Sequence, residues 1–203
     1  MKTYPKHNNM RPVFQSKTCF SKNIEGLGNF ELFPLDLDEH VPVIHNWVNQ
    51  EYAEYWQMLD TTTEQVYEAY EYLLAQKDYY ICMGYFEGEP CFLLECYHPK
   101  HVLSKFYNVE DSDCGMHILV APPDKKIKSF TWSVFQTIME FLFSDHRIER
   151  VVVEPDVRNE KVHKLNRKAG FTRYKKIQLL EKEAYLEFCT REQFKNALQN
   201  QIV

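Results

Sequence analysis

The segment from Asp113 to Glu154 places a strand, a long helix and a second strand in succession. DCGMHILVAPP (113–123) is an apolar, β-rich run, and residues 126–144 carry apolar side chains at helical spacing. RVVVE (150–154) is again typical of a buried strand. A connection of this length through a helix joins parallel strands by a right-handed crossover. The chain must therefore contain a parallel strand pair covered by a helix, which makes it an α/β protein.

The remaining patterns add antiparallel strands and further helices around this pair. Residues 79–99 predict a β-hairpin that turns at Glu87-Gly88-Glu89, and further strands are predicted at 29–36, 174–181 and 184–190. Helices are predicted at 38–49, 64–77, 159–169 and 191–200. We therefore expect one domain over residues 28–203, with a mixed sheet and helices on both faces, preceded by a flexible, polar N-terminal arm over residues 1–27.

The composition supports such a domain and excludes several classes of function. Of the 203 residues, 44% are hydrophobic, which is enough apolar material for a well-filled core. The net charge of -5 and the lack of a basic block argue against a nucleic-acid partner. No apolar run is long enough to span a membrane, and the polar start MKTYPKHNNMRP lacks the apolar middle of a signal peptide. We therefore expect a cytoplasmic protein with no membrane partner.

The six cysteines favour a structural role. None form a C-x-x-C pair, so the paired ligand spacing of a zinc site is absent. Four of them, Cys82, Cys91, Cys96 and Cys114, fall within strand-like apolar runs. We interpret them as small buried hydrophobic side chains in a reducing compartment.

His117 is the first candidate for chemistry. In CGMHILV, strand alternation puts Met116, Ile118 and Val120 on one face and His117 with Leu119 on the other. An imidazole titrates near neutral pH and so suits proton transfer. The structural alternative is an ordinary core histidine bonded to a neighbour.

Asp156 is the second candidate. It follows the carboxyl end of the strand at 150–154, where open α/β sheets bind their ligands. Pro155 ends the strand and Asn159 caps the next helix, so capping does not require Asp156, which is either a turn aspartate or a functional carboxylate. Because the crossover sets this strand beside the strand of His117, we predict that the two side chains face one crevice as an acid–base pair.

The start of the long helix, PPDKKIKSFTW, is the third candidate. Free amides at a helix N-terminus attract anions, and Lys125, Lys126 and Lys128 stand beside them. This segment is therefore either a phosphate site or a solvated basic turn.

These residues, in this order, resemble the siderophore-biosynthesis branch of the GNAT acyltransferase superfamily. The resemblance covers about residues 30–187 and is carried by the stretches HVPVIHNWVNQEYAEYW, FLLECYHP, DSDCGMHILVAPP, RVVVEPDVRNEKVHKLNRKAGF and LLEKEAYL. The combination of D-x-G-x-H with V-E-P-D-x-R-N is its specific signature. Members of this branch acylate N-hydroxylysine, N-hydroxycadaverine or N-hydroxyputrescine, and one group modifies the mycobactin lysine.

The resemblance implies the GNAT fold, a mixed and mostly antiparallel sheet whose central parallel pair is splayed to admit acyl-CoA. It implies acetyl-CoA or another acyl-CoA as co-substrate, no metal, and other enzymes of the siderophore pathway as possible partners. His117 and Asp156 would form the active-site pair, with Asp156 orienting the histidine or accepting the substrate proton. The acceptor pocket would be flanked by Trp56, Glu95 and Tyr97. The residues expected to bind acyl-CoA are Leu119, Val120, Lys126, Lys128, Ser129 and Asn159.

One stretch departs from the family pattern. The pyrophosphate loop of this branch usually carries glycines, which accept positive φ and let the backbone approach the phosphates. Here the loop is Lys126-Ile127-Lys128-Ser129. The contacts of the loop with CoA therefore rest on helix amides and lysine charges.

The mechanism that this resemblance implies is direct acyl transfer to an N-hydroxylated amine. Such a nitrogen is largely neutral near pH 7, so His117, with a pKa near neutrality, would be a sufficient base. The product would be a hydroxamate, and no covalent acyl-enzyme is expected.

Two other classes of function stay open. The chain could be a GNAT enzyme for another amine, such as an aminoglycoside or a protein N-terminus, or a non-catalytic module that binds CoA or a partner. Within the first hypothesis, the sequence distinguishes neither lysine-derived from diamine-derived acceptors nor acetyl from succinyl donors. A carboxylate on either substrate would require a cation in the site.

Overall fold

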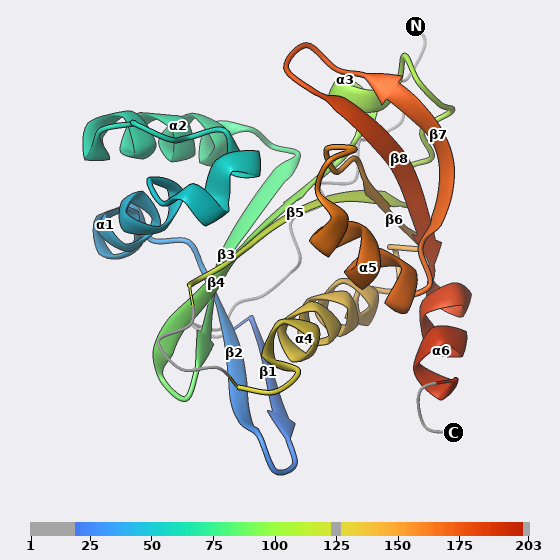
Figure 1. The fold of residues 1–203 in the computed structure, drawn as a ribbon, viewed down its shortest axis with the longest axis horizontal. Coiled ribbons are helices and arrows are strands. Elements are labelled where there is room, and N and C mark those ends of the chain that lie inside the picture. Colours follow the sequence, from blue (N-terminus) through green and yellow to red (C-terminus); the bar gives the residue numbers. More distant parts are fainter. Residues whose placement is uncertain (1–18, 123–126, 201–203) are drawn as a thin grey trace, which may run out of the picture.

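The computed structural model describes residues 19–122 and 127–200 (Figure 1). They form an eight-stranded sheet in the order β1-β2-β3-β4-β5-β6-β8-β7. The strands are β1 (Phe20–Ile24), β2 (Gly28–Pro34), β3 (Tyr79–Phe86), β4 (Glu89–Tyr97), β5 (Asp113–Val120), β6 (Arg150–Val153), β7 (Thr172–Gln178) and β8 (Glu183–Thr190). The helices are α1 (Leu37–Val48), the 3-10 helix η1 (Glu51–Trp56), α2 (Thr63–Ala75), α3 (Lys100–Leu103), α4 (Phe130–Ser144), α5 (Glu160–Lys168) and α6 (Arg191–Gln199).

The central strands β5 and β6 are parallel and diverge. Their pairing covers only Asp113–Gly115 with Arg150–Val152, whereas β5 continues to Val120 along β4. The other strand pairs in the described residues are antiparallel. The predicted mixed α/β sheet with one splayed parallel pair is therefore confirmed. Beyond Gly115, no strand in the described part of the chain pairs with the β6-facing edge of β5, so its backbone groups are open to a ligand.

Helices cover both faces of the sheet, as predicted. Helix α4 packs on one face, where its apolar side meets alternate residues of the strands, and α1 and α2 pack on the other (Figure 1). The alternation along β5 follows the same division, because Met116 belongs to the core under α4 and Leu119 to the core under α1 and α2. His117 points to the Leu119 face, where its ring lies against Trp56.

The N-terminal boundary differs from the prediction. Residues 1–27 were expected to form a flexible arm, but Phe20–Ile24 forms β1, paired with β2 through Phe20↔Leu32 to Ile24↔Gly28. The strand was hidden by its polar composition, since only Phe20 and Ile24 pack against the core. Residues 1–18 of the predicted arm lie outside the described residues.

Helix α4 begins later than predicted. The apolar spacing suggested a start at residue 126, but Ser129 has φ 63° and the helix begins at Phe130. A residue in the left-handed region cannot be part of a right-handed helix. Two short helices, η1 and α3, were not predicted because each is too brief for a periodic pattern. None of the helices in the described ranges has the length and apolar character to cross a bilayer.

Candidate active site

A cavity of about 450 Å³ opens where β5 and β6 diverge. Its walls come from β4, β5, the end of β6, η1, α4, α5 and the turn before β8. It gathers most of the predicted site residues: Trp56, Glu95, His117, Leu119, Val120, Asp156 and Asn159. The divergence of the two strands therefore brings the predicted acceptor and acyl-CoA residues to one place.

His117 lies between two buried carboxylates. Its Nδ1 is 3.0 Å from Glu95 Oε2, and its Nε2 is 2.7 Å from Glu154 Oε1. Glu95 is the direct cross-strand neighbour of His117 between β4 and β5, and Glu154 follows the last residue of β6. With a carboxylate at each nitrogen, the ring is held as a doubly donating imidazolium.

This environment changes the protonation state expected for His117. Burial alone would lower its pKa, but the charge and hydrogen bond of Glu154, followed by those of Glu95, outweigh burial and raise the pKa to about 10. The expectation that His117 is a neutral base with a pKa near neutrality was wrong, because the sequence did not show that Glu95 and Glu154 contact its two ring nitrogens. At pH 7 the imidazolium has no lone pair with which to accept a proton.

Glu154 is the residue that sequence reasoning missed. Burial alone would raise its pKa, but His117, Lys182 and a hydrogen bond from Tyr97 hold the pKa below the usual range, so the carboxylate is ionised. A signal was present in the sequence. Glu154 follows three valines and shares the strand face of Val152, which is the face opposite α4.

Asp156 does not pair with His117. Its carboxylate accepts hydrogen bonds from Arg158, at 2.8 Å from the backbone N and at 2.9 and 2.8 Å from the guanidinium. The hydrogen bonds of this guanidinium hold the pKa of Asp156 below its ordinary value. The orienting role predicted for Asp156 thus falls to Glu154 and Glu95, while Asp156 still lines the cavity as an ionised carboxylate.

Tyr97 lies behind the histidine and not in the acceptor pocket. It is 2% exposed, and its hydroxyl donates to Glu154 Oε2 at 3.0 Å and lies 3.3 Å from His117 Nε2. The ring covers Gly115, where an added Cβ would lie 2.5 Å from it. Tyr97 was expected to flank the substrate, but the cavity lining does not include it, and it supports the two charged side chains instead.

Trp56 and Glu95 are joined through a third residue. Trp56 Nε1 donates to the hydroxyl of Tyr70 at 3.1 Å, and that hydroxyl donates to Glu95 Oε1 at 3.0 Å. Trp56 also meets His117 edge-to-face, with ring centroids 6.3 Å apart. The aromatic wall supplied by η1 is therefore tied to the charged centre by hydrogen bonds.

The two sequence motifs are explained by these contacts. In D-x-G-x-H, Asp113 binds Arg150 of the neighbouring strand at 2.6 and 2.8 Å, Gly115 leaves room for Tyr97, and His117 meets the carboxylates. In V-E-P-D-x-R-N, Asp156 holds Arg158, and Asn159 caps α5 by accepting from Val162 N at 3.2 Å. The motifs therefore combine structural and charged positions at the point where the strands part.

The predicted pyrophosphate loop is described in part. Lys126 lies outside the described residues, while Lys128 and Ser129 are exposed at the start of α4. The positive φ that glycine would accept falls on Ser129, whose side chain makes no capping hydrogen bond. The first-turn amides of α4 are therefore left without a side-chain cap, and Thr131 of this turn reaches the cavity lining.

No metal-binding geometry emerges from this arrangement. In the part of the chain that the structure covers, no three histidine, cysteine, aspartate or glutamate side chains are grouped to hold a metal ion. The cavity presents three groups to a ligand. They are the charged cluster of His117, Glu95 and Glu154, the open edge of β5 and the start of α4.

Comparison with known proteins identifies a matching family and a relative of similar length. Residues 36–179 match the family model described as the acetyltransferase (GNAT) domain. The N-hydroxyputrescine acetyltransferase of Acinetobacter baumannii is 25% identical over 189 residues, which cover 91% of this chain and 89% of that protein.

Solved structures share the fold. An uncharacterized protein from Bacillus halodurans superposes with a TM-score of 0.83 at 22% identity, covering 89% of this chain and 94% of its own. The aminoglycoside acetyltransferase AAC(6')-Ib in complex with coenzyme A gives 0.72 at 20% identity, covering 82% of this chain and 98% of its own. Spermidine N-acetyltransferase from Vibrio cholerae, in complex with CoA and spermine, gives 0.64 at 15% identity, covering 82% and 98%.

Proposed function

The chain belongs to the GNAT acetyltransferase family and is an acyl-CoA-dependent N-acyltransferase, and we propose that it acylates an N-hydroxylated lysine or diamine to a hydroxamate for siderophore biosynthesis. The coverage of nearly all of the N-hydroxyputrescine acetyltransferase supports this acceptor class. The signature D-x-G-x-H with V-E-P-D-x-R-N supports it as well.

The position of His117 between two carboxylates is the observation that carries the proposal, since Nδ1 lies 3.0 Å from Glu95 and Nε2 lies 2.7 Å from Glu154. The imidazolium cannot deprotonate an alkylammonium, whose pKa is about 10.4. The carboxylates of Glu154 and Asp156 are ionised and therefore weak bases, since hydrogen bonds and neighbouring cations hold their pKa values below the usual range. Such a site matches an acceptor nitrogen that is already neutral at pH 7, and an N-hydroxylated amine meets this condition.

The donor is proposed to enter between β5 and β6. The open edge of β5, including the backbone of Leu119 and Val120, offers amide groups to the pantetheine arm and to the thioester oxygen. The uncapped start of α4, with Ser129 and Lys128, faces the CoA phosphates in this arrangement. Asn159 stands on the opposite wall at the start of α5.

The proposed transfer is direct. The neutral acceptor nitrogen attacks the thioester carbon, and the C–S bond breaks as the tetrahedral intermediate collapses. The proton released by nitrogen is taken up by the Asp156 carboxylate and ends on the CoA sulfur, so the products are the hydroxamate and free thiol. His117 holds Glu95 and Glu154 in place through its two ring nitrogens and keeps the pKa of Glu154 low, and positioning supplies most of the acceleration.

The competing functions differ in whether an acceptor amine is used and in its charge at pH 7. The aminoglycoside and spermidine enzymes share only the fold with this chain, and the amines for which they are named are cationic at pH 7. A non-catalytic CoA-binding module would need no acceptor at all. These alternatives therefore make different predictions for thiol release.

A thiol-release assay with acetyl-CoA tests the proposal. We expect turnover with at least one of N-hydroxyputrescine, N-hydroxycadaverine and N-hydroxylysine. The parent amine should react at least about a hundredfold more slowly at pH 7, since roughly one alkylamine molecule in 2,500 is neutral there. Hydroxamate formation is read separately by the colour of its ferric complex. Equal rates with the parent amines would indicate a general amine acetyltransferase, and CoA binding without thiol release from any amine would indicate a binding module.

A further inference from the structure

Lys182 is a cation of the cavity to which the proposed transfer assigns no contact with a substrate. It lies in the turn between β7 and β8, its side chain is 18% exposed, and it lines the same cavity as His117. Its Nζ is 3.8 Å from Glu154 Oε1, which is an ion-pair distance beyond hydrogen-bonding range. Within the described ranges, no residue accepts a hydrogen bond from this ammonium, which carries three donors.

The carboxylates of the cavity differ from Lys182 in this respect. Glu95 is bonded to His117 and Tyr70, and both oxygens of Glu154 accept, from His117 and from Tyr97. Asp156 is held by Arg158 on both of its oxygens, as described above. The acidic groups of the cavity are thus satisfied by the protein itself, whereas a partly buried ammonium beside them is not.

We propose that Lys182 is a carboxylate-binding residue of the substrate site, which pairs with a carboxylate carried by the acyl group or by the acceptor. A carboxylate accepts hydrogen bonds and donates none, so it complements the free donors of Lys182. The position suits either substrate, because Glu154 joins Lys182 to His117 at the reacting centre. The inference rests on the proposed function, since both substrate classes come from it.

A purely supporting role for Lys182 makes a different prediction. Glu95, Glu154 and the His117 imidazolium sum to one negative charge, which Lys182 offsets. If that were its only role, loss of the ammonium would impair every substrate alike. If Lys182 binds a substrate carboxylate, the loss is confined to substrates that carry one.

Two donors and two acceptors, combined into four donor–acceptor pairs, distinguish these possibilities. Acetyl-CoA and succinyl-CoA differ by a terminal carboxylate, and N-hydroxycadaverine and N-hydroxylysine differ by the α-carboxylate. We expect the wild type to favour one carboxylate-bearing substrate over its carboxylate-free counterpart by about tenfold or more in kcat/KM. The donor comparison and the acceptor comparison identify which substrate carries the group.

The variants are Lys182→Met, Lys182→Gln and Lys182→Arg. Met and Gln should abolish the preference, so that kcat/KM falls at least about tenfold further on the preferred carboxylate-bearing substrate than on its carboxylate-free counterpart, and Arg should retain the preference. Lys176→Met is the matched control, since Lys176 is on the same hairpin but forms an exposed pair with Glu183 at 2.8 Å, away from the cavity. It should leave all four pairs unchanged.

Two results would overturn the assignment alone: an equal loss on all four pairs in Lys182→Met and Lys182→Gln, or no carboxylate preference in the wild type. Two variants at position 182 guard against a folding defect in either one, and circular dichroism confirms the fold of each. If the wild type turned over none of the four pairs, the proposed acceptor class would fail and the Lys182 assignment would fail with it.

Discussion

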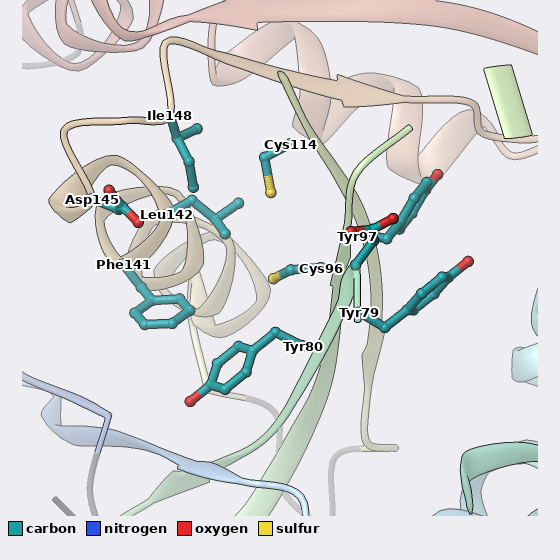
Figure 2. A pocket seen from close by; sticks show the side chains of 10 residues that line it. Tyr79, Tyr80, Cys96, Tyr97, Cys114, Phe141, Leu142, Asp145 and Ile148 are labelled. Atoms are coloured by element: carbon teal, nitrogen blue, oxygen red, sulfur yellow. The ribbon is translucent and has the colours of Figure 1, made fainter. Parts of the chain in front are cut away.

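The two faces of β4 and β5 place opposite chemistry on neighbouring residues. On one face, Glu95 and His117 belong to a charged cluster beside a cavity of about 450 Å³. On the other face, Cys96 and Cys114 point toward α4, at a cavity of about 30 Å³ lined by Phe141, Leu142 and Ile148 among others (Figure 2). We call the small cavity beside Cys96 and Cys114 the thiol cavity. It is separated from the charged cluster by the thickness of a single sheet.

The two faces differ in the charge state of their buried polar side chains. Figure 2 shows the rings of Tyr79 and Tyr97 directed away from the cysteine sulfurs, toward the opposite side of the strands. A hydrogen bond with Cys114 and then burial raise the pKa of Cys96 well above the ordinary thiol value, so it stays neutral and unreactive. On the active face, charge persists because each carboxylate has a cationic partner. Along β4 and β5, side chains that pack in the core therefore alternate with side chains that line the active-site cavity.

Replacement of His117 by Ala should have the largest effect on activity. The imidazolium is the only cation between Glu95 and Glu154 among the contacts described above, so we expect kcat to fall by about 100-fold or more. Acyl-CoA binding, measured by calorimetry, should change little because the β5 edge and the α4 start are intact. Cys114→Ala, on the opposite face of β5, is the control. An unchanged kcat would remove His117 from the mechanism.

Two carboxylate variants separate orientation from proton transfer. Glu154→Gln should lower the pKa of His117, because a negative charge and a strong hydrogen bond are lost. Asp156→Asn should leave that pKa unchanged and should lower kcat by about 100-fold through loss of the proton acceptor. The pKa is read from the NMR titration of the His117 ring. If Asp156→Asn turned over at the wild-type rate, Asp156 would not be the group that accepts the substrate proton.

Gly115→Ala should break the support behind the charged cluster. The new Cβ would lie 2.5 Å from the Tyr97 ring, so the ring must move away from Glu154 and His117. We expect a loss of about 1–3 kcal/mol in the free energy of unfolding, the usual range for overpacking a filled site, together with reduced kcat. Urea unfolding measures the first effect. Gly88→Ala, at φ 84°, gives the cost of backbone strain without a clash, since nothing lies within 4 Å of its added Cβ, and it should leave kcat unchanged. Equal stability of Gly115→Ala and wild type would contradict the packing argument.

The stability of the charged face should depend on pH. The pKa of His117 is raised to about 10 from an unfolded value of 6.5, so its contribution to stability is complete below pH 6.5 and is lost as the pH rises through about 10. Urea unfolding of the wild type and of His117→Gln at several pH values isolates this contribution as their difference. A difference that stayed constant between pH 6.5 and 10 would show that His117 is not held as an imidazolium.

The thiol cavity should give the smallest effect. Cys96→Ala removes one buried sulfur, and we expect a loss of about 1 kcal/mol in stability with no change in kcat or in its pH dependence. Thermal unfolding and the thiol-release assay measure the two effects. A large fall in kcat would show that the two faces are coupled through the sheet and would remove the distinction between them.

Much of the fold was accessible from the sequence because it depends on local periodicity. The strand–helix–strand unit and the alternation of Met116 with His117 follow from patterns of a few residues. The N-cap of Asn159 was predicted correctly from residue type, and its side chain accepts from Val162 N. Strand β1 was missed because its alternation is carried by only two apolar residues, Phe20 and Ile24.

The sequence by itself indicated that a histidine and a carboxylate, His117 and Asp156, would lie where two parallel strands part, since topology and side-chain alternation follow from short patterns. Only the tertiary structure decided which carboxylate meets the histidine. Glu154 lies 37 residues from His117, and the point at which β6 ends aims it, and not Asp156, at the ring. Protonation follows from those distances, because two carboxylates close to one imidazole hold its proton, and no count of residues along the chain reveals that.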